Sequence, residues 1–248
     1  MDDTFRIRAE AAAAALRQFF PEGTPDPTVQ VGVWPHTAVA DAVWLVSHKG
    51  SRYEKNWYSI IDDILRTLFP SSLGFSITPQ APPEVSSRKS IDFMAFHIVW
   101  SNGQWDRLPV LIWEAKPSGL GGFDKQDADR QMRERYLGYQ EGYALPVLFG
   151  ISSIGPWLQA YVVFNSNKTI WPPRPADADA QHVTQWPNYW HRHNMFRESG
   201  ATLLHQIADQ IKEMVQHVRG SENLTPSPEQ KQVAIENLEN ALNSGEWD

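Results

Sequence analysis

Two oppositely charged residues stand at the end of a segment that is otherwise apolar. Residues 110–118 read VLIWEAKPS, so Glu114 and Lys116 follow a run of apolar side chains that Pro117 stops. Side chains alternate between the two faces of a strand, which places Glu114 and Lys116 on the same side. Burying charge there costs several kcal/mol unless the charge is paired or binds a metal ion.

A third charged residue, Asp92, lies near the start of the preceding apolar segment, SIDFMAFHIVW. The connection between that segment and residues 107–116 contains Asn102-Gly103, a turn signal that predicts an antiparallel hairpin. The start of one strand then lies beside the end of the next, so Asp92 and Glu114 are expected to be neighbours. Two adjacent carboxylates are oxygen ligands of the kind that Mg²⁺ prefers, and a lysine beside them could orient or deprotonate a water molecule.

The hydrophobic pattern predicts the elements that must position these residues. In residues 51–69 apolar side chains recur at i, i+3, i+4 and i+7, which predicts an amphipathic helix that Pro70 ends. Further helices are expected at 4–20, 37–48, about 124–142 and 200–218. Strands are expected at 90–100, 107–116, 145–152 and 157–164. From residue 51 to residue 164 the expected order is helix, strand, strand, helix, strand, strand.

The order and spacing of Asp92, Glu114 and Lys116 resemble the PD-(D/E)xK phosphodiesterase superfamily, the restriction-endonuclease-like nucleases. Asp92 of SIDF matches the Asp of that family and WEAK matches its Glu-x-Lys motif, although Ile91 stands where the family has proline. The resemblance covers roughly residues 51–164. It implies a layered α/β fold with a restriction-endonuclease-like core, in which helices flank a mixed sheet of four to five strands. The general look is closest to restriction-like nuclease domains of eukaryotic microbes, including Crinkler-type effectors.

The resemblance also implies a role for each residue of the motif. Asp92, Glu114 and the backbone carbonyl of Ala115 would hold Mg²⁺ or Mn²⁺. Lys116 would assist the water molecule that attacks the phosphodiester.

Two further residues are candidates for the site. Glu54 would be the acidic residue that many members carry on the helix before the sheet; its alternative role is that of an N-terminal carboxylate favoured by the helix dipole. Gln131 would correspond to the polar residue that some subfamilies bring back to the site, and its alternative is a surface or capping residue.

Other charged groups have simpler interpretations. His191 and His193 have the spacing of two metal ligands on a strand, but no third ligand is evident. The charge pattern of the helix expected at about 124–142 predicts a solvated face of mixed charge, because its arginines interleave with acidic residues. These are Arg130, Arg133, Arg135, Asp127, Asp129 and Glu134.

Two classes of function remain open. The first is a metal-dependent nuclease that hydrolyses phosphodiester bonds of nucleic acid, with DNA favoured over RNA. The second is a module that keeps the nuclease fold and binds nucleic acid or a protein partner without cleaving it. The intact Asp92, Glu114 and Lys116 favour the first, whereas the net charge of −7 favours the second. A glycosidase would leave Lys116 unexplained, and a kinase would need a glycine-rich phosphate loop before a strand lysine.

Composition sets the broader limits. A chain of 248 residues, 42% of them hydrophobic, is large enough for one sizeable core or at most two small ones. The absence of cysteine excludes disulfides, thiolate metal sites and a cysteine nucleophile. The apolar run at 11–16 is too short for a signal peptide, and no apolar stretch could span a bilayer. We expect a cytoplasmic or nuclear protein with no membrane partner, and a protein partner or homodimer is compatible with the sequence.

The expected organisation has three parts. Residues 1–50 form an N-terminal helical extension packed on the core, and residues 51–218 form the nuclease-like domain. Residues 219–248 form a linker and an acidic C-terminal helix.

Overall fold

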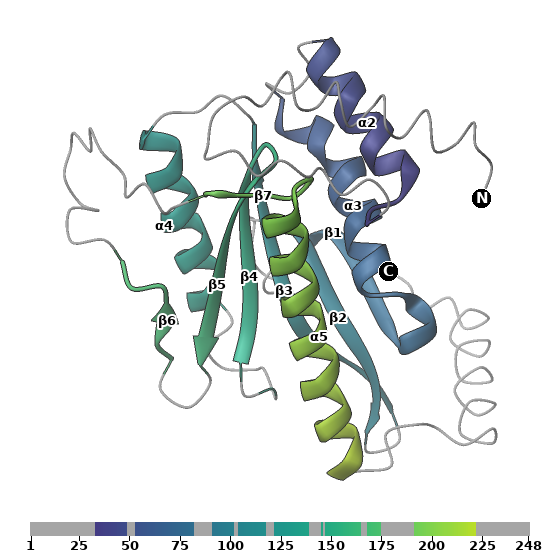
Figure 1. The fold of residues 1–248 in the computed structure, drawn as a ribbon. Helices are drawn as coiled ribbons and strands as arrows, with labels where there is room; N and C mark the ends of the chain where they lie inside the picture. The colour runs from purple at the N-terminus through teal and green to yellow at the C-terminus, as the bar shows by residue number, and fades with distance from the viewer. Residues whose placement is uncertain are drawn as a thin grey trace, which may run out of the picture.

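A mixed sheet of seven strands lies at the centre of the fold (Figure 1). The computed structural model describes residues 33–48, 53–81, 91–101, 104–117, 122–138, 145, 147–164, 168–174 and 191–221. The strands are β1 (Phe75–Ala81), β2 (Ile91–Ser101), β3 (Gln104–Lys116), β4 (Val147–Ile154), β5 (Trp157–Phe164), β6 (Ile170–Trp171) and β7 (His193–Asn194). Their order is β1-β2-β3-β4-β5-β6, and β7 pairs with β5. Only the β3–β4 pair is parallel among these pairings.

In the described part of the chain, four α-helices pack against the sheet and complete the α/β fold. They are α2 (His36–Ser47), α3 (Tyr58–Leu68), α4 (Gly122–Gly138) and α5 (Glu198–Ser221). Short 3₁₀ helices precede and follow α3: η2 (Glu54–Trp57) and η3 (Ser71–Leu73). The helices expected at 37–48, 51–69, 124–142 and 200–218 are confirmed, although the second begins as a 3₁₀ turn. In the described part of the chain, no helix combines the length and the apolar character that crossing a membrane would need.

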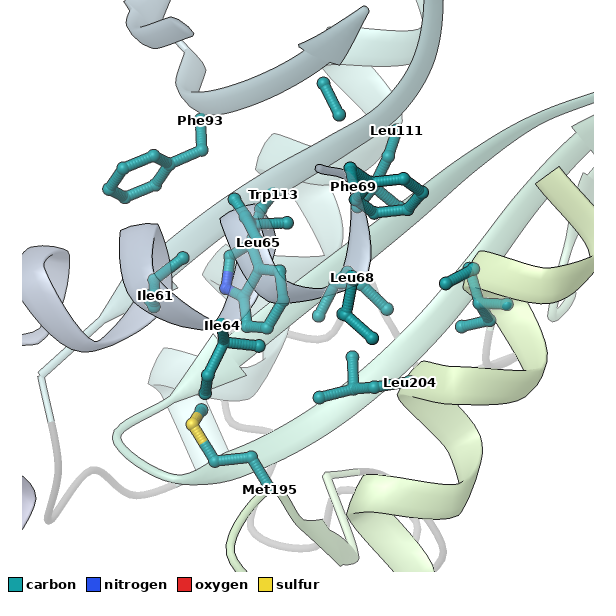
Figure 2. Packing of buried hydrophobic residues seen from close by; sticks show 14 of the residues in the cluster. Ile61, Ile64, Leu65, Leu68, Phe69, Phe93, Leu111, Trp113, Met195 and Leu204 are labelled. Atoms are coloured by element: carbon teal, nitrogen blue, oxygen red, sulfur yellow. The ribbon is translucent and has the colours of Figure 1, made fainter. Parts of the chain in front are cut away.

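Two apolar clusters occupy the two faces of the sheet. The larger cluster joins α2, α3 and α5 to the face on which Leu111, Trp113 and Ala115 of β3 lie. Figure 2 shows Trp113 packed among side chains of α3, with Leu204 of α5 close by. The smaller cluster includes Ile112 together with Met132 of α4. The alternation along β3 therefore places Glu114 and Lys116 on the face that α4 covers.

The expected sheet of four to five strands was too small. The four expected strands are present as β2, β3, β4 and β5, and β2 and β3 form the expected antiparallel hairpin. Strand β1 was not predicted, because Pro79 interrupts its pattern and its middle residues are partly exposed. Both features are typical of a strand at the edge of a sheet, which is where β1 lies. β6 and β7 have two residues each, too few for a periodic pattern.

Several expectations fall outside the described residues. They are the helix at 4–20, the turn at Asn102-Gly103, most of the first 50 residues and the acidic C-terminal helix. The boundaries expected at residues 50 and 218 stay predictions. Within the described part, Ala38, Ala42 and Leu45 of α2 enter the larger apolar cluster together with α3.

Candidate metal-binding and catalytic site

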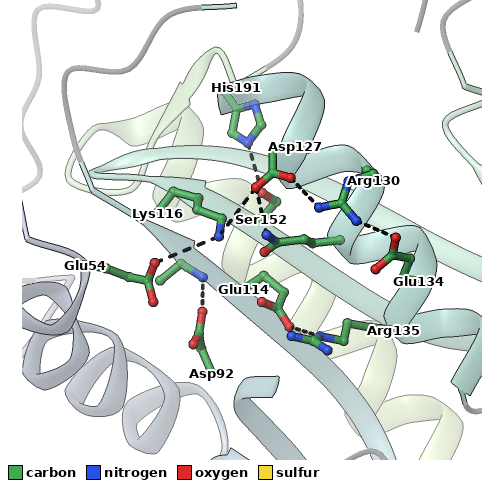
Figure 3. A network of polar contacts seen from close by, with 12 residues as sticks. Glu54, Asp92, Glu114, Lys116, Asp127, Arg130, Glu134, Arg135, Ser152 and His191 are labelled. Atoms are coloured by element: carbon green, nitrogen blue, oxygen red, sulfur yellow. Dashed lines mark hydrogen bonds and ion pairs between the residues drawn. The ribbon is translucent and has the colours of Figure 1, made fainter. Parts of the chain in front are cut away.

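Asp92 and Glu114 are buried neighbours on the first residues of β2 and the last residues of β3 (Figure 3). The antiparallel register pairs Phe93 with Trp113, so the next residues outward are Asp92 and Glu114. The backbone N–H of Ala115 donates a hydrogen bond of 2.7 Å to Asp92 Oδ2. This bond fixes the Asp92 carboxylate against the backbone of β3. The structure thus confirms that Asp92 and Glu114 are neighbours, as the predicted hairpin implied.

Arg135 of α4 compensates the charge of Glu114. Its Nε donates to Glu114 Oε1 at 2.6 Å, and the two side chains are only 12% and 3% exposed. Burial raises the pKa of Glu114 to about 7, and the neighbouring charge of Asp92 adds to this effect. Arg135 and Lys116 act in the opposite direction. Burial therefore makes Glu114 harder to ionise than an ordinary carboxyl group, while Arg135 favours its charged form.

The expectation of a solvated, mixed-charge face on α4 was only partly right. Arg130 fits it, because its side chain is half-exposed and pairs with Asp127 and Glu134 along the helix. Arg133 and Arg135 instead lie mostly buried, each against a buried carboxylate. Arg133 pairs with Asp129 at 2.9 Å on the same helix. The charge alternation resembled a solvated face because sequence alone does not show which side of α4 meets the sheet.

Glu54 reaches the site through Tyr58, a residue that the sequence argument did not single out. The Tyr58 hydroxyl lies 2.5 Å from Asp92 Oδ1 and 3.1 Å from Glu54 Oε1, so that its single hydrogen faces both carboxylates. Burial raises the pKa of Glu54, and the charge of Asp92 raises it further. Burial and the hydrogen bond to Asp92 raise the pKa of Tyr58, which therefore keeps its proton. The i, i+4 spacing of Glu54 and Tyr58 was the available sequence signal.

Lys116 lies between two acidic side chains at the end of β3. Its Nζ is 3.9 Å from Glu54 Oε2 and 4.0 Å from Asp127 Oδ2. Gln131 Nε2 donates to the same oxygen of Asp127 at 2.7 Å. Gln131 therefore meets the site through Asp127, and no direct contact of Gln131 with Asp92 is among its described interactions. Asp127 is a second residue that the sequence argument missed as a site residue.

A buried polar row continues from Glu114 across the sheet. The register pairs Glu114 with Ser152 of β4, and Ser152 with Gln159 of β5. Ser152 Oγ lies 3.1 Å from His191 Nε2, and the His191 backbone N–H donates to Gln159 Oε1 at 3.4 Å. His191 has a left-handed backbone with φ of 53°. Its contact with Ser152 joins residues 39 positions apart, which no local pattern could reveal.

The oxygen atoms of the site are ligands of the kind that Mg²⁺ or Mn²⁺ prefers, although few side chains provide them. Asp92, Glu114 and the carbonyl of Ala115 are oxygen donors, and Mg²⁺ is often held by one or two carboxylates while it keeps several waters. Each Asp92 oxygen accepts one hydrogen bond from the described residues, and a carboxylate oxygen can accept two. Across the described ranges, no three His, Asp or Glu side chains group so that they could hold a metal ion. The residues therefore fit a hard cation with two carboxylates as its side-chain ligands.

Comparisons of the chain with protein-family models, with curated proteins and with solved structures each find no match. The fold and the geometry of the site are therefore the basis for a functional proposal.

The buried groups His191 and Glu114 should give opposite pH dependences of stability. Burial lowers the pKa of His191 from 6.5 to about 3, and the charge of Lys125 adds to this effect. Between these values the unfolded chain binds more protons, so the free energy of unfolding contributed by His191 falls as the pH falls. The raised pKa of Glu114 makes the folded state bind more protons between 4.5 and about 7, so its contribution falls as the pH rises.

Urea unfolding between pH 4.5 and 6.5, in the presence of EDTA, tests both signs. The stability of His191→Gln relative to wild type should decrease as the pH rises, by at most about 1.4 kcal/mol per pH unit. The relative stability of Glu114→Gln should increase over the same range. Stability curves of both variants that run parallel to wild type would contradict these assignments.

Proposed function

We propose that this chain is a metal-dependent nuclease that hydrolyses phosphodiester bonds of nucleic acid, DNA more readily than RNA. The observation that carries this proposal is the convergence of Asp92, Glu114 and Lys116 where β2 begins and β3 ends, with both carboxylates buried. Isolated buried carboxylates are costly, and their pairing with cationic groups is what makes such a site stable. A site of this kind also has the charges that phosphodiester hydrolysis requires.

Each residue has a distinct role in the proposed reaction. Asp92, Glu114 and the carbonyl of Ala115 would hold Mg²⁺ or Mn²⁺. The bound ion would supply Lewis-acid stabilisation of the negative charge that develops on the phosphate. Lys116 would donate hydrogen bonds to the attacking water and add positive charge beside the phosphate. Glu54 and Asp127 would hold the Lys116 ammonium in place from two sides.

The reaction adds water across one phosphodiester bond. The water oxygen bonds to phosphorus, one bridging P–O bond breaks, and the leaving oxygen takes up a proton. Glu114 and Asp92 are buried, and charges interact more strongly away from bulk water. Charges held at this site would therefore act strongly on the negative charge that develops on the phosphate.

The order of the central elements supports a restriction-endonuclease-like core. An antiparallel hairpin, β2–β3, leads through α4 to β4, which lies parallel to β3, and β5 then returns antiparallel. This order agrees with what the resemblance to PD-(D/E)xK nucleases implies. The similarity to Crinkler-type effector domains, and action in the cytoplasm or nucleus, belong to the same proposal.

A second candidate function rests on the ion pair between Arg135 and Glu114. This contact gives one of the two carboxylates a counter-ion from the chain itself, so Glu114 is compensated without a metal ion. Together with the net charge of −7, it favours a module that keeps the fold and binds nucleic acid or a protein partner without cleavage.

Titration of Mn²⁺ into the protein by isothermal calorimetry separates the two functions. Wild type should bind Mn²⁺ saturably, and Asp92→Asn should bind it at least about tenfold more weakly. Even residues that only hydrogen-bond to a metal ligand contribute about tenfold to metal affinity. Asp209→Asn is the matched control, because Asp209 is 73% exposed on α5, against the opposite face of the sheet. Equal affinity in wild type and Asp92→Asn would contradict the site, and no saturable binding to wild type would favour the non-cleaving module.

A further inference from the structure

Tyr58 is held in a fixed orientation beside the proposed metal ligands. It is the first residue of α3, one turn after Glu54 of η2. Its ring packs edge-on against Phe93, with ring centroids 5.1 Å apart and an interplanar angle of 74°. Because Phe93 follows Asp92 in β2, this packing sets the phenol against the start of that strand. Packing of the Tyr58 ring against Phe93 therefore sets the position of its hydroxyl group.

The Tyr58 hydroxyl joins two carboxylates that come from different elements. Asp92 Oδ1 and Glu54 Oε1 both lie within hydrogen-bonding distance of it, at 2.5 Å and 3.1 Å. Without a donor between them, two carboxylates so close together would repel one another. The hydroxyl is thus the neutral link that lets Glu54 of η2 and Asp92 of β2 share one corner of the site.

The remaining oxygens of the two carboxylates extend this link into a ring. Asp92 Oδ2 accepts from the backbone N–H of Ala115. Glu54 Oε2 faces the ammonium of Lys116 at 3.9 Å. Since Ala115 and Lys116 are consecutive, the contacts run from Ala115 through Asp92, Tyr58 and Glu54 back to Lys116. Tyr58 therefore touches both the metal-binding side and the lysine side of the proposed site.

We propose that Tyr58 is a positioning residue of the active site, which orients Asp92 toward the metal ion and Glu54 toward Lys116. This inference rests on the proposed nuclease function. The single O–H hydrogen of Tyr58 is shared between Asp92 Oδ1 and Glu54 Oε1 and restricts the rotation of both carboxylates, which leaves Asp92 Oδ2 and Glu54 Oε2 directed at their own partners. Residues that orient ligands in this way are part of the metal site, although they do not touch the ion.

Tyr58→Phe tests the proposal, because it removes only the hydroxyl oxygen and keeps the ring against Phe93. In a calorimetric titration, Tyr58→Phe should bind Mn²⁺ about 10- to 100-fold more weakly than wild type. Tyr53→Phe is the matched control, since Tyr53 precedes Glu54 and its side chain is 63% exposed. It should bind Mn²⁺ as wild type does. Unfolding midpoints measured without metal identify any purely structural loss, which would shift the midpoint and leave the affinity of the folded protein unchanged.

A double-mutant cycle with Glu54→Gln tests which partner transmits the effect. If Tyr58 also orients Lys116 through Glu54, Tyr58→Phe should lower the cleavage rate at saturating Mn²⁺ by a smaller factor in the Glu54→Gln background than in wild type. Losses that simply add would show that Tyr58 acts without Glu54 and would overturn that part of the proposal. Wild-type affinity in Tyr58→Phe would overturn the positioning role alone. Absence of Mn²⁺ binding to wild type would overturn the proposed function and the positioning role together.

Discussion

Lys116→Ala is expected to lower the rate of metal-dependent nucleic-acid cleavage by roughly 10²- to 10³-fold, the range for the loss of one positioned hydrogen-bond donor at the reacting atoms. Lys116 Nζ lies beside Glu54 and Asp127 at the edge of the carboxylate pair, where it can contact the attacking water. It is not an oxygen donor, and removal of a positive charge does not weaken cation binding. Mn²⁺ affinity should therefore be retained in the variant. The rate is measured as conversion of supercoiled plasmid at saturating Mg²⁺ or Mn²⁺.

Two further variants sharpen the interpretation of this loss. Lys212→Ala removes a lysine that pairs with Asp209 on α5, and its rate should equal that of wild type. Lys116→Arg keeps the charge but changes the shape of the donor, so it should restore only part of the activity. Full activity in Lys116→Ala would remove Lys116 from the mechanism.

Arg135→Met is expected to lower the free energy of unfolding by about 3 kcal/mol at pH 9, where Glu114 is ionised in the wild-type protein, because it leaves a buried carboxylate without its counter-ion. Glu114 is 3% exposed and accepts the Arg135 Nε–H at 2.6 Å. The loss should be smaller at acidic pH, where Glu114, with its pKa already raised to about 7, becomes neutral in the folded state. Urea unfolding in EDTA measures both values.

A matched pair of variants controls for the loss of the Arg135 side chain. Arg130→Met removes a half-exposed arginine from the same helix and should change stability by no more than about 0.5 kcal/mol. The double variant Arg135→Met/Glu114→Gln removes both charges and should regain most of the lost stability. If Arg135→Met were as stable as Arg130→Met, the ion pair would not support the fold.

The sequence predicted the elements whose side chains repeat over several turns or strand positions. The apolar stripe of α3 and the hairpin of β2 and β3 were both predicted, and the hairpin made Asp92 and Glu114 neighbours. Strand β1 was missed, because Pro79 and its partly exposed positions interrupt the alternating apolar pattern by which a strand is recognised. Strands β6 and β7 are too short to leave a pattern.

The contacts around the candidate site were harder to predict than its central residues. Tyr58 meets Asp92 only because α3 packs beside the start of β2, a tertiary contact that spans 34 residues. Arg135 meets Glu114 across 21 residues, and its alternation with acidic neighbours suggested the wrong face of α4. Gln131 was correctly assigned to the helix after the lysine, but its contact is with Asp127. Such residues depend on how two elements approach one another, which local periodicity does not specify.

The most direct test of the nuclease proposal is a cleavage assay of the wild-type chain on supercoiled plasmid, linear duplex DNA, single-stranded DNA and RNA. Each substrate is incubated with Mg²⁺, with Mn²⁺ or with EDTA, and Lys116→Ala is run beside wild type. We expect cutting that requires the metal ion, favours DNA and is lost in the variant. Absence of cutting with either metal, by a protein shown to be folded, would contradict the nuclease and favour the non-cleaving binding module.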